Sequence, residues 1–141
     1  TEDLSGVYLD SYLNDLIAQL INIYNPNATP VRTLIEIPSI HLDLTVAVPL
    51  GLIINELISN SLDHGLKNQS DSYISVKFVQ DYLTARLFIH DNGTGLDEGF
   101  DPHNSESLGL LLVNNLASQL NGSFDLYNDD DGVTAIIEFK L

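Results

Sequence analysis

Apolar residues recur at helical spacing in three stretches of the chain. In Leu4–Tyr24, leucine and isoleucine return every three or four residues, which is the period of an amphipathic helix. Thr45 is a candidate N-cap for a second, more apolar helix that runs to about Leu66. The third predicted helix is Leu108–Leu120, which an Asn-Gly pair closes.

Shorter segments, rich in β-branched residues or alternating in polarity, predict strands between and after these helices. The predicted strands are Val31–Pro38, His41–Leu44, Ser72–Val79, Leu83–His90, Ser123–Tyr127 and Val133–Leu141. The third and fourth form one hairpin and the last two form another, while the polar stretch 91–107 reads as a long loop. Helices combined with an antiparallel-rich sheet predict one domain over residues 1–141, of the α+β class and built as a two-layer α/β sandwich.

The charge balance is strongly acidic, with five Lys and Arg against twenty Asp and Glu and a formal net charge of −15. Such a surface repels nucleic acid and anionic membranes, so neither is an expected partner. An anionic ligand would have to be held by a metal ion, by backbone N–H groups and by helix N-termini. Solubility, or adaptation to a salty cytosol, also explains the acidity.

Composition also excludes several classes of protein. The absence of Cys excludes disulfides, thiolate metal sites and a cysteine nucleophile. No apolar run reaches about 18 residues, and no basic region precedes an apolar core, so neither a membrane span nor a signal peptide is predicted. Because the first residue is Thr1, we expect the chain to be a fragment of a longer protein.

The second predicted helix carries a group of polar residues on one side. Glu56, Asn60, Asp63, His64 and Lys67 fall within an arc of roughly 100° at 3.6 residues per turn. The opposite arc holds Leu50, Ile54, Leu57, Ile58 and Ser61. A carboxylate and a carboxamide one turn apart, amid leucine and isoleucine, indicate a partly buried polar site that a ligand satisfies.

This helix face has ligands suited to a hard metal ion. The carbonyl oxygen of Asn60 fits Mg²⁺, which keeps several waters and takes phosphate oxygens as its other ligands. Glu56 could hold or deprotonate a metal-bound water. The alternative is that Glu56 is an ordinary exposed helix residue and that His64 merely packs at the helix end.

Two glycine-containing segments complete the candidate site. Asp91, at a strand end, is an acceptor for an amino proton such as that of adenine, and Gly93 and Gly95 let the backbone approach a flat base. His90 should point to the other face of the sheet. Gly109, at the start of the third helix, would present free N–H groups to an anion. Taken singly, these segments also read as an ordinary β-turn and an ordinary helix cap.

No Walker motif and no GxGxxG motif occurs, so a nucleotide site here is neither a P-loop nor a dinucleotide fold. The motifs that do occur are Asn55-Glu56-Leu57-Ile58-Ser59-Asn60, Asp91-Asn92-Gly93-Thr94-Gly95 and Ser107-Leu108-Gly109-Leu110. In this order and spacing they resemble the N box and the two glycine boxes of the Bergerat-type ATP-binding domain. Sensor histidine kinases, type II topoisomerases, heat-shock chaperone ATPases and mismatch-repair ATPases share that domain.

The chain is most similar to the catalytic domain of sensor histidine kinases, from about Leu4 to Leu141. The resemblance implies a Bergerat fold, with a mixed, mostly antiparallel sheet covered on one face by helices. It also implies ATP and Mg²⁺ as ligands, with Asn60 binding the metal and Glu56 as the catalytic residue that assists attack by the phosphoacceptor histidine. Asp91 would bond the adenine amino group, and 96–107 would form a lid over the nucleotide.

The resemblance extends to further nucleotide contacts. The residues expected to contact the nucleotide are Asn60, Asp63, His64, Lys67, Asp91, Gly93, Gly95, Leu96, Ser107, Leu108, Gly109, Leu110 and Thr134. Phe100, within the expected lid, could fold into the lid or dock a partner. The two alternatives remain open at this point.

Two positions depart from the family pattern. Asp63 stands where the family usually has Lys or Arg, which should weaken nucleotide binding, and Lys67 is expected to compensate in part from the same helix face. Near the C-terminus, Gly132-Val133-Thr134 shifts the usual hydroxyl by one position and therefore to the other strand face. Thr134 stays a candidate despite this shift.

The resemblance implies transfer of the γ-phosphoryl group of ATP to a histidine on an upstream dimerisation domain, and from there to a response regulator receiver domain. We expect a monomeric fragment that does not autophosphorylate alone, a homodimeric full-length protein and a cytoplasmic location, including the cytoplasmic part of a membrane-bound sensor. The alternatives are an ATP-hydrolysing conformational clamp, a degenerate partner-binding domain that binds no nucleotide, and a related protein-serine kinase.

Overall fold

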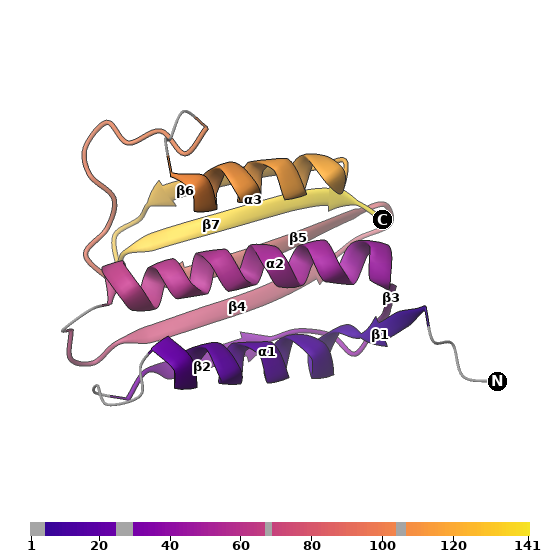
Figure 1. Cartoon of the computed structure of the whole chain (residues 1–141), viewed down its shortest axis with the longest axis horizontal. Coiled ribbons are helices and arrows are strands. Elements are labelled where there is room, and N and C mark those ends of the chain that lie inside the picture. Colours follow the sequence, from indigo (N-terminus) through magenta and orange to yellow (C-terminus); the bar gives the residue numbers. More distant parts are fainter. Residues whose placement is uncertain (1–4, 25–29, 67–68, 104–106) are drawn as a thin grey trace.

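The computed structural model describes residues 5–24, 30–66, 69–103 and 107–141. Its elements, in chain order, are β1 (Gly6–Tyr8), α1 (Leu9–Tyr24), β2 (Arg32–Glu36), β3 (His41–Asp43), α2 (Leu44–Asn60), the π-helical turn η1 (Ser61–Gly65), β4 (Tyr73–Gln80), β5 (Thr84–Asp91), α3 (Leu108–Gln119), β6 (Ser123–Asn128) and β7 (Val133–Lys140). Three helices lie side by side over one face of a sheet, with α2 between α1 and α3 (Figure 1).

The main sheet has five strands in the order β2-β4-β5-β7-β6. The β2–β4 pair is parallel, and the other three pairs are antiparallel. The predicted α+β sandwich, with a mixed and mostly antiparallel sheet covered on one face, is confirmed. Both predicted hairpins are present, and their strand ends differ from the predicted ones by at most one residue.

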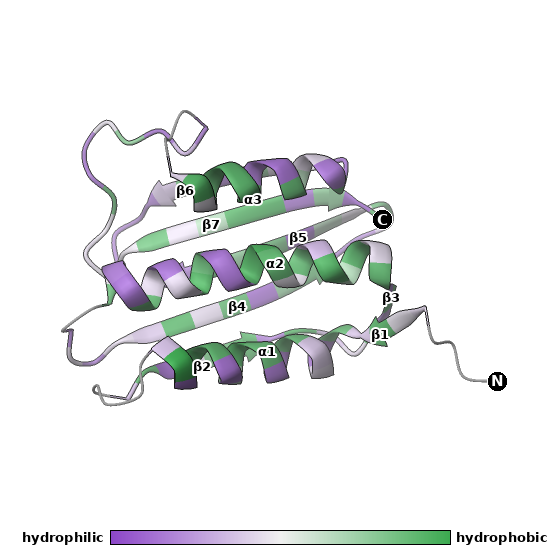
Figure 2. Cartoon of the chain, viewed as in Figure 1, coloured by the Kyte–Doolittle hydropathy of each residue, from purple (hydrophilic) through white to green (hydrophobic). Residues whose placement is uncertain are grey.

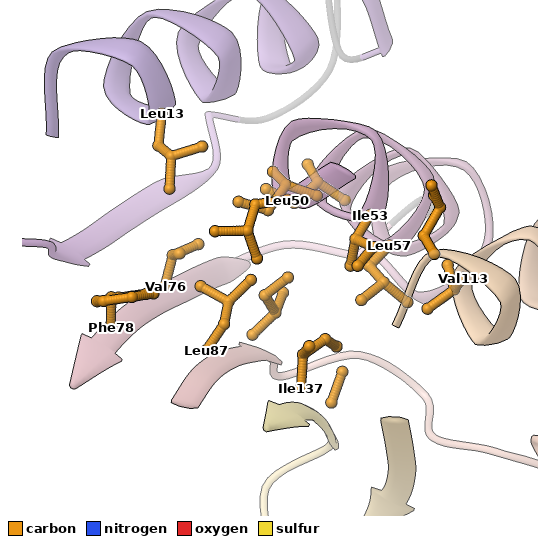
Figure 3. Packing of buried hydrophobic residues seen from close by; sticks show 14 of the residues in the cluster. Leu13, Leu50, Ile53, Leu57, Val76, Phe78, Leu87, Val113 and Ile137 are labelled. Carbon is orange, nitrogen blue, oxygen red and sulfur yellow. The ribbon is translucent and has the colours of Figure 1, made fainter. Parts of the chain in front are cut away.

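The core lies between the helices and the sheet, because alternate strand residues point toward α2. Ala85, Leu87 and Ile89 are buried on β5, as the two-residue period of a strand requires. Figure 3 shows Leu13, Leu50, Ile53, Leu57 and Val113 of the helices meeting Val76, Phe78, Leu87 and Ile137 of the sheet. Each fully buried aliphatic side chain contributes about 1.5–3 kcal/mol to folding.

The α2–η1 helix occupies the centre of this core. By length and composition alone, Leu44–Gly65 could cross a membrane, but 44% of its most apolar window is buried inside the domain. Figure 2 shows its C-terminal end turning hydrophilic, where the polar residues of the candidate site lie. The apolar character of this helix is therefore that of a central core helix.

The starts of two predicted helices are wrong. The first helix begins at Leu9 rather than Leu4, because residues 6–8 form a strand that pairs with β3 in a separate two-stranded sheet. The second helix begins at Leu44, with Asp43 rather than Thr45 at the N-cap and no side-chain cap. Leu44 N donates to the Ser5 carbonyl at 2.8 Å, so a backbone contact satisfies this first helical N–H group.

The sheet face opposite the helices carries a network around the β6–β7 turn. His90 Nδ1 lies 2.8 Å from Thr134 Oγ1 and 3.1 Å from Asp129 Oδ2, and Thr134 donates to Asp129 at 2.6 Å. Tyr73 donates its hydroxyl proton to Asp131. These bonds lower the pKa of both carboxyl groups, chiefly through the Thr134 hydroxyl at Asp129 and the Tyr73 hydroxyl at Asp131. As predicted, His90 points away from the face that Asp91 occupies.

Tyr73 should titrate late and report on this network. Its hydrogen bond to Asp131, and then its burial, raise its pKa from 10.0 to about 12. Since the folded-state pKa exceeds the unfolded one, this contribution to stability is complete below pH 10.0 and disappears as the pH rises toward 12. Tyrosinate absorbance during an alkaline titration should therefore lose its highest-pKa step in Tyr73→Phe. The same change at the fully exposed Tyr82 should leave that step in place, and a late step surviving in Tyr73→Phe would contradict the assignment.

Candidate functional site

The C-terminal end of α2 widens into the π turn η1. Leu66 N donates to the Ser61 carbonyl at 2.7 Å, an i to i+5 bond that places one more residue in the turn than an α-helix would. Turns of this kind are rare and often occur at functional sites. Ser61, on the apolar arc as predicted, is buried against the end of β5, and His64 and Gly65 of the turn line the same cavity.

A cavity of about 430 Å³ opens between this turn, the ends of β5 and β7, the loop after β5 and the start of α3. Its volume is within the usual range for a small-molecule site. The lining residues are Leu57, Asn60, Ser61, His64, Gly65, Ile89, Asp91, Thr94, Gly95, Leu96, Asp97, Phe100, Ser107, Leu110, Leu126, Val133 and Ala135. The cavity thus has largely apolar walls and polar groups from α2, β5 and the loop.

Asp91 is the buried acceptor of this cavity, with only 6% of its surface exposed. Ser61 Oγ lies 2.6 Å from Asp91 Oδ2 and 3.1 Å from the Leu57 carbonyl, and its single proton favours the shorter contact with the charged carboxylate. Gly93 N donates to Asp91 Oδ1 at 2.9 Å. Each oxygen therefore has one protein donor, and a carboxylate has about four acceptor sites. The remaining lone pairs can accept from a ligand.

Gly93 is required by the close approach of the loop to η1. A Cβ atom on Gly93 would lie 2.4 Å from the Gly65 carbonyl oxygen and 2.7 Å from its carbon. The next residue, Thr94, donates its N–H to the same carbonyl at 3.1 Å. Gly95 has φ of +88°, a conformation that glycine adopts without strain. The glycines thus let the loop lie directly against the end of the helix.

Glu56 and the start of α3 form the outer rim. Gly109 is so close to Glu56 that a Cβ atom on it would lie 2.8 Å from Glu56 Oε2. The hydroxyl of Ser107, the N-cap of α3, accepts from Leu110 N at 3.5 Å. A helix N-terminus carries partial positive charge and free N–H groups, which favour an anion such as a phosphate.

The rim residues fit a magnesium ion only in company with its other ligands. Within the described residues, no group of three or more His, Cys, Asp or Glu could hold a metal. Mg²⁺ often takes only one or two protein ligands and fills its octahedron with waters and substrate phosphates. Asn60, which lines the cavity, and the carboxylate of Glu56 one turn earlier fit that pattern.

Most predicted site residues come together. Those that line the cavity are Asn60, His64, Asp91, Gly95, Leu96, Ser107 and Leu110. Gly93, Glu56 and Gly109 adjoin it, whereas Asp63 is exposed and outside its lining. The Leu108 side chain is 81% exposed and also lies outside the lining, so only its backbone belongs to the helix N-terminus. Lys67 lies outside the described residues.

The prediction for Thr134 is wrong. Its side chain lies on the sheet face opposite the helices, bonded to Asp129 and His90. Its neighbours on β7, Val133 and Ala135, line the cavity instead. The one-position shift seen in the sequence therefore does move the hydroxyl out of the site, as the two-residue period of a strand requires.

Sequence reasoning missed Ser61 and the apolar walls. The walls come from strand residues that alternate with outward-facing ones, and Ile89, two positions before Asp91, could have been found by that period. Helical spacing places Ser61 correctly on the buried arc with Leu57, but nothing in the sequence pairs it with Asp91. Phe100, left open by the sequence, lines the cavity.

The chain matches a known family over most of its length. Residues 45–141 match the family described as histidine kinase-, DNA gyrase B-, and HSP90-like ATPase. The fold and the site define a nucleotide-binding domain of the Bergerat type. The chain belongs to this ATPase family, and its relatives and structural neighbours place it with the catalytic domains of sensor histidine kinases.

Three similar proteins illustrate the relationship. Sensor histidine kinase PdtaS of Mycolicibacterium smegmatis is 28% identical over 131 residues, which make up 89% of this chain and 26% of PdtaS. The histidine kinase domain of a blue-light activated histidine kinase from Erythrobacter litoralis has a TM-score of 0.85 at 18% identity, covering 99% of this chain and 69% of that one. The ATP binding domain of PrrB from Mycobacterium tuberculosis has a TM-score of 0.75 at 22% identity, covering 96% and 95%. The two structural likenesses show a shared fold.

Proposed function

We propose that this domain binds Mg·ATP and donates the γ-phosphoryl group to a histidine of a two-component sensor kinase. The observation that carries the proposal is Asp91, a buried, doubly hydrogen-bonded carboxylate at the edge of a cavity with apolar walls. A flat base with an exocyclic amino group fits such a site, because the walls pack against its faces and the carboxylate accepts its amino proton. Adenine has this chemistry.

The phosphates would lie at the rim, between the α3 N-terminus and Asn60. No Lys or Arg lines the cavity in the described part of the chain, and the net charge is −15. The negative charge of a triphosphate therefore needs a metal ion and backbone N–H groups. Mg²⁺, held by Asn60 with Glu56 nearby, would supply that neutralisation.

In phosphoryl transfer the protein contributes mainly positioning and electrostatic stabilisation. We assign Glu56 to orienting and accepting a proton from the attacking histidine, because its carboxylate lies at the rim beside Gly109. The phosphoaccepting histidine would belong to a dimerisation domain outside this chain. The match to this chain covers only 26% of PdtaS. A response regulator receiver domain would take the phosphoryl group next. We place the domain in the cytoplasm, as a monomer by itself and within a homodimer in the whole protein.

An ATP-hydrolysing clamp is the second candidate, because the same Glu56 carboxylate could activate water.

The structure weakens the argument for a degenerate domain that binds no nucleotide. Asp63, expected to repel the nucleotide, is exposed and does not line the cavity. Its charge is therefore screened by solvent.

Glu56→Gln distinguishes kinase from hydrolase. In the full-length protein given ATP labelled at the γ-phosphate, we expect acid-labile protein label, and its formation should slow about a hundredfold or more in the variant. ATP affinity should change little. Glu36→Gln, an exposed change on β2, is the matched control. Steady release of free phosphate by the isolated domain, lost in Glu56→Gln, would support the clamp and contradict the kinase proposal.

A further inference from the structure

The loop after β5 forms one wall of the cavity and is held from outside the cavity. Thr94, Gly95, Leu96 and Asp97 all line the cavity. The side chain of Asn128, at the end of β6, pairs with both backbone groups of Leu96. Leu96 N donates to Asn128 Oδ1 at 2.7 Å, and Asn128 Nδ2 donates to the Leu96 carbonyl at 3.2 Å.

The local geometry is built around this pairing. Gly95 has φ of +88°, and a Cβ atom on it would lie 3.0 Å from Asn128 Oδ1. A side chain there would be strained by its backbone and crowded by the carboxamide. The glycine thus lets the loop bend so that the backbone N–H and carbonyl of Leu96 both face Asn128.

Asn128 is itself held in place by a fixed turn. It pairs with Val133 at the end of the β6–β7 ladder. The carboxylate of the following residue, Asp129, accepts from the N–H groups of Asp131 at 2.9 Å and Gly132 at 2.8 Å and from the Thr134 hydroxyl at 2.6 Å. The side chain of Asn128 therefore extends toward the loop from a turn that three hydrogen bonds to Asp129 hold in place.

The next part of the wall begins directly after the residue that Asn128 holds. Phe100 N donates to the Asp97 carbonyl at 3.1 Å, so 97–100 forms a turn directly after the held residue Leu96. Phe100 lines the cavity. Release of Leu96 would let this turn, and Phe100 with it, move away from the cavity.

We propose that Asn128 is a positioning residue for the nucleotide site, which holds the wall 94–97 and the turn that follows in the shape that receives the base and ribose. This inference rests on the proposed function. Asn128 lies outside the lining of the cavity, so it acts through Leu96 rather than by touching the nucleotide. If the wall is in this shape for only a fraction of the time, the apparent affinity falls by that fraction.

The test combines amide hydrogen exchange at Leu96 with calorimetric titration of a non-hydrolysable ATP analogue with Mg²⁺. In Asn128→Ala we expect faster exchange at Leu96 without nucleotide and an affinity about 5- to 30-fold weaker, as expected for the loss of two hydrogen bonds. Asn128→Leu, of similar size but without either bond, should behave alike and decides the matter if the alanine variant fails to fold. Asp125→Ala, an exposed change on the same strand, should match the parent protein in both measurements.

The outcomes separate the two proposals. Faster exchange at Leu96 with unchanged affinity for the analogue would overturn the positioning role and leave the ATP site standing. Unchanged exchange at Leu96 in both variants would overturn the pairing itself. A parent protein that binds no adenine nucleotide would overturn the proposed function and this inference together.

Discussion

Asp91→Ala should reduce adenine-nucleotide binding about a hundredfold, the largest effect expected of a single change in the cavity. The carboxylate is the buried acceptor for the base, and a hydrogen bond to a charged group contributes about 1.5–3 kcal/mol, which corresponds to about a 10- to 150-fold change in affinity. Its removal also leaves Ser61 Oγ and Gly93 N without this acceptor. Calorimetry with an ATP analogue and Mg²⁺ measures the loss.

The matched control for this change is Asp81→Ala. Asp81 precedes β5 at the end opposite to Asp91, and it accepts a hydrogen bond from Thr84 N at 3.2 Å on the surface. Asp81→Ala removes the same charge as Asp91→Ala from this acidic protein but does not alter the cavity. Equal affinities in Asp91→Ala and Asp81→Ala would contradict the assignment of Asp91 to the base.

Gly93→Ala should lower both the stability of the domain and its affinity for nucleotide. The new Cβ atom would lie 2.4 Å from the Gly65 carbonyl oxygen. The backbone fixes the positions of both the Cβ atom and the carbonyl oxygen, so neither can rotate away. Overpacking of this kind costs about 1–3 kcal/mol of unfolding free energy. Displacement of the loop would also break the hydrogen bond from Thr94 N to Gly65. Denaturant unfolding and nucleotide titration measure the two effects.

Gly65→Ala is the comparison for this second prediction. A Cβ atom on Gly65 would lie 3.5 Å from Asp91 Oδ1, an ordinary contact distance. We expect its unfolding free energy to remain within about 0.5 kcal/mol of the parent protein, as for a substitution that removes no specific interaction. If Gly93→Ala were as stable as Gly65→Ala, the close packing of the loop on η1 would not be a constraint.

The elements that follow a simple period could be predicted from the sequence. β5 alternates regularly, so the opposite directions of His90 and Asp91 follow from the two-residue repeat. β1 could not be predicted in this way, since three residues show no period and its pairing partner β3 lies far along the chain. The start of α2 was missed for a similar reason, because Ser5, distant in sequence, satisfies the N–H group of Leu44.

The same distinction applies to the site. Asn60, Asp91 and Gly95 stand in motifs whose order indicated one pocket, and the structure brings them to one cavity. Ser61 is buried on the apolar arc beside Leu57, as predicted, but its bond to Asp91 joins two segments 30 residues apart and no short motif indicates it. Asn128 was missed altogether, because it bonds to the backbone of Leu96 rather than to a side chain, and no short motif joins the two residues.

Titration of the domain with a non-hydrolysable ATP analogue, with and without Mg²⁺ and beside the corresponding GTP analogue, tests the central claim most directly. We predict binding of the adenine compound in the micromolar to sub-millimolar range and weaker binding without Mg²⁺. The guanine compound should also bind more weakly, because it has a keto oxygen, which cannot donate to Asp91, at the position of the adenine amino group. No binding at millimolar nucleotide, or equal binding of both bases, would contradict the assignment of this cavity to ATP.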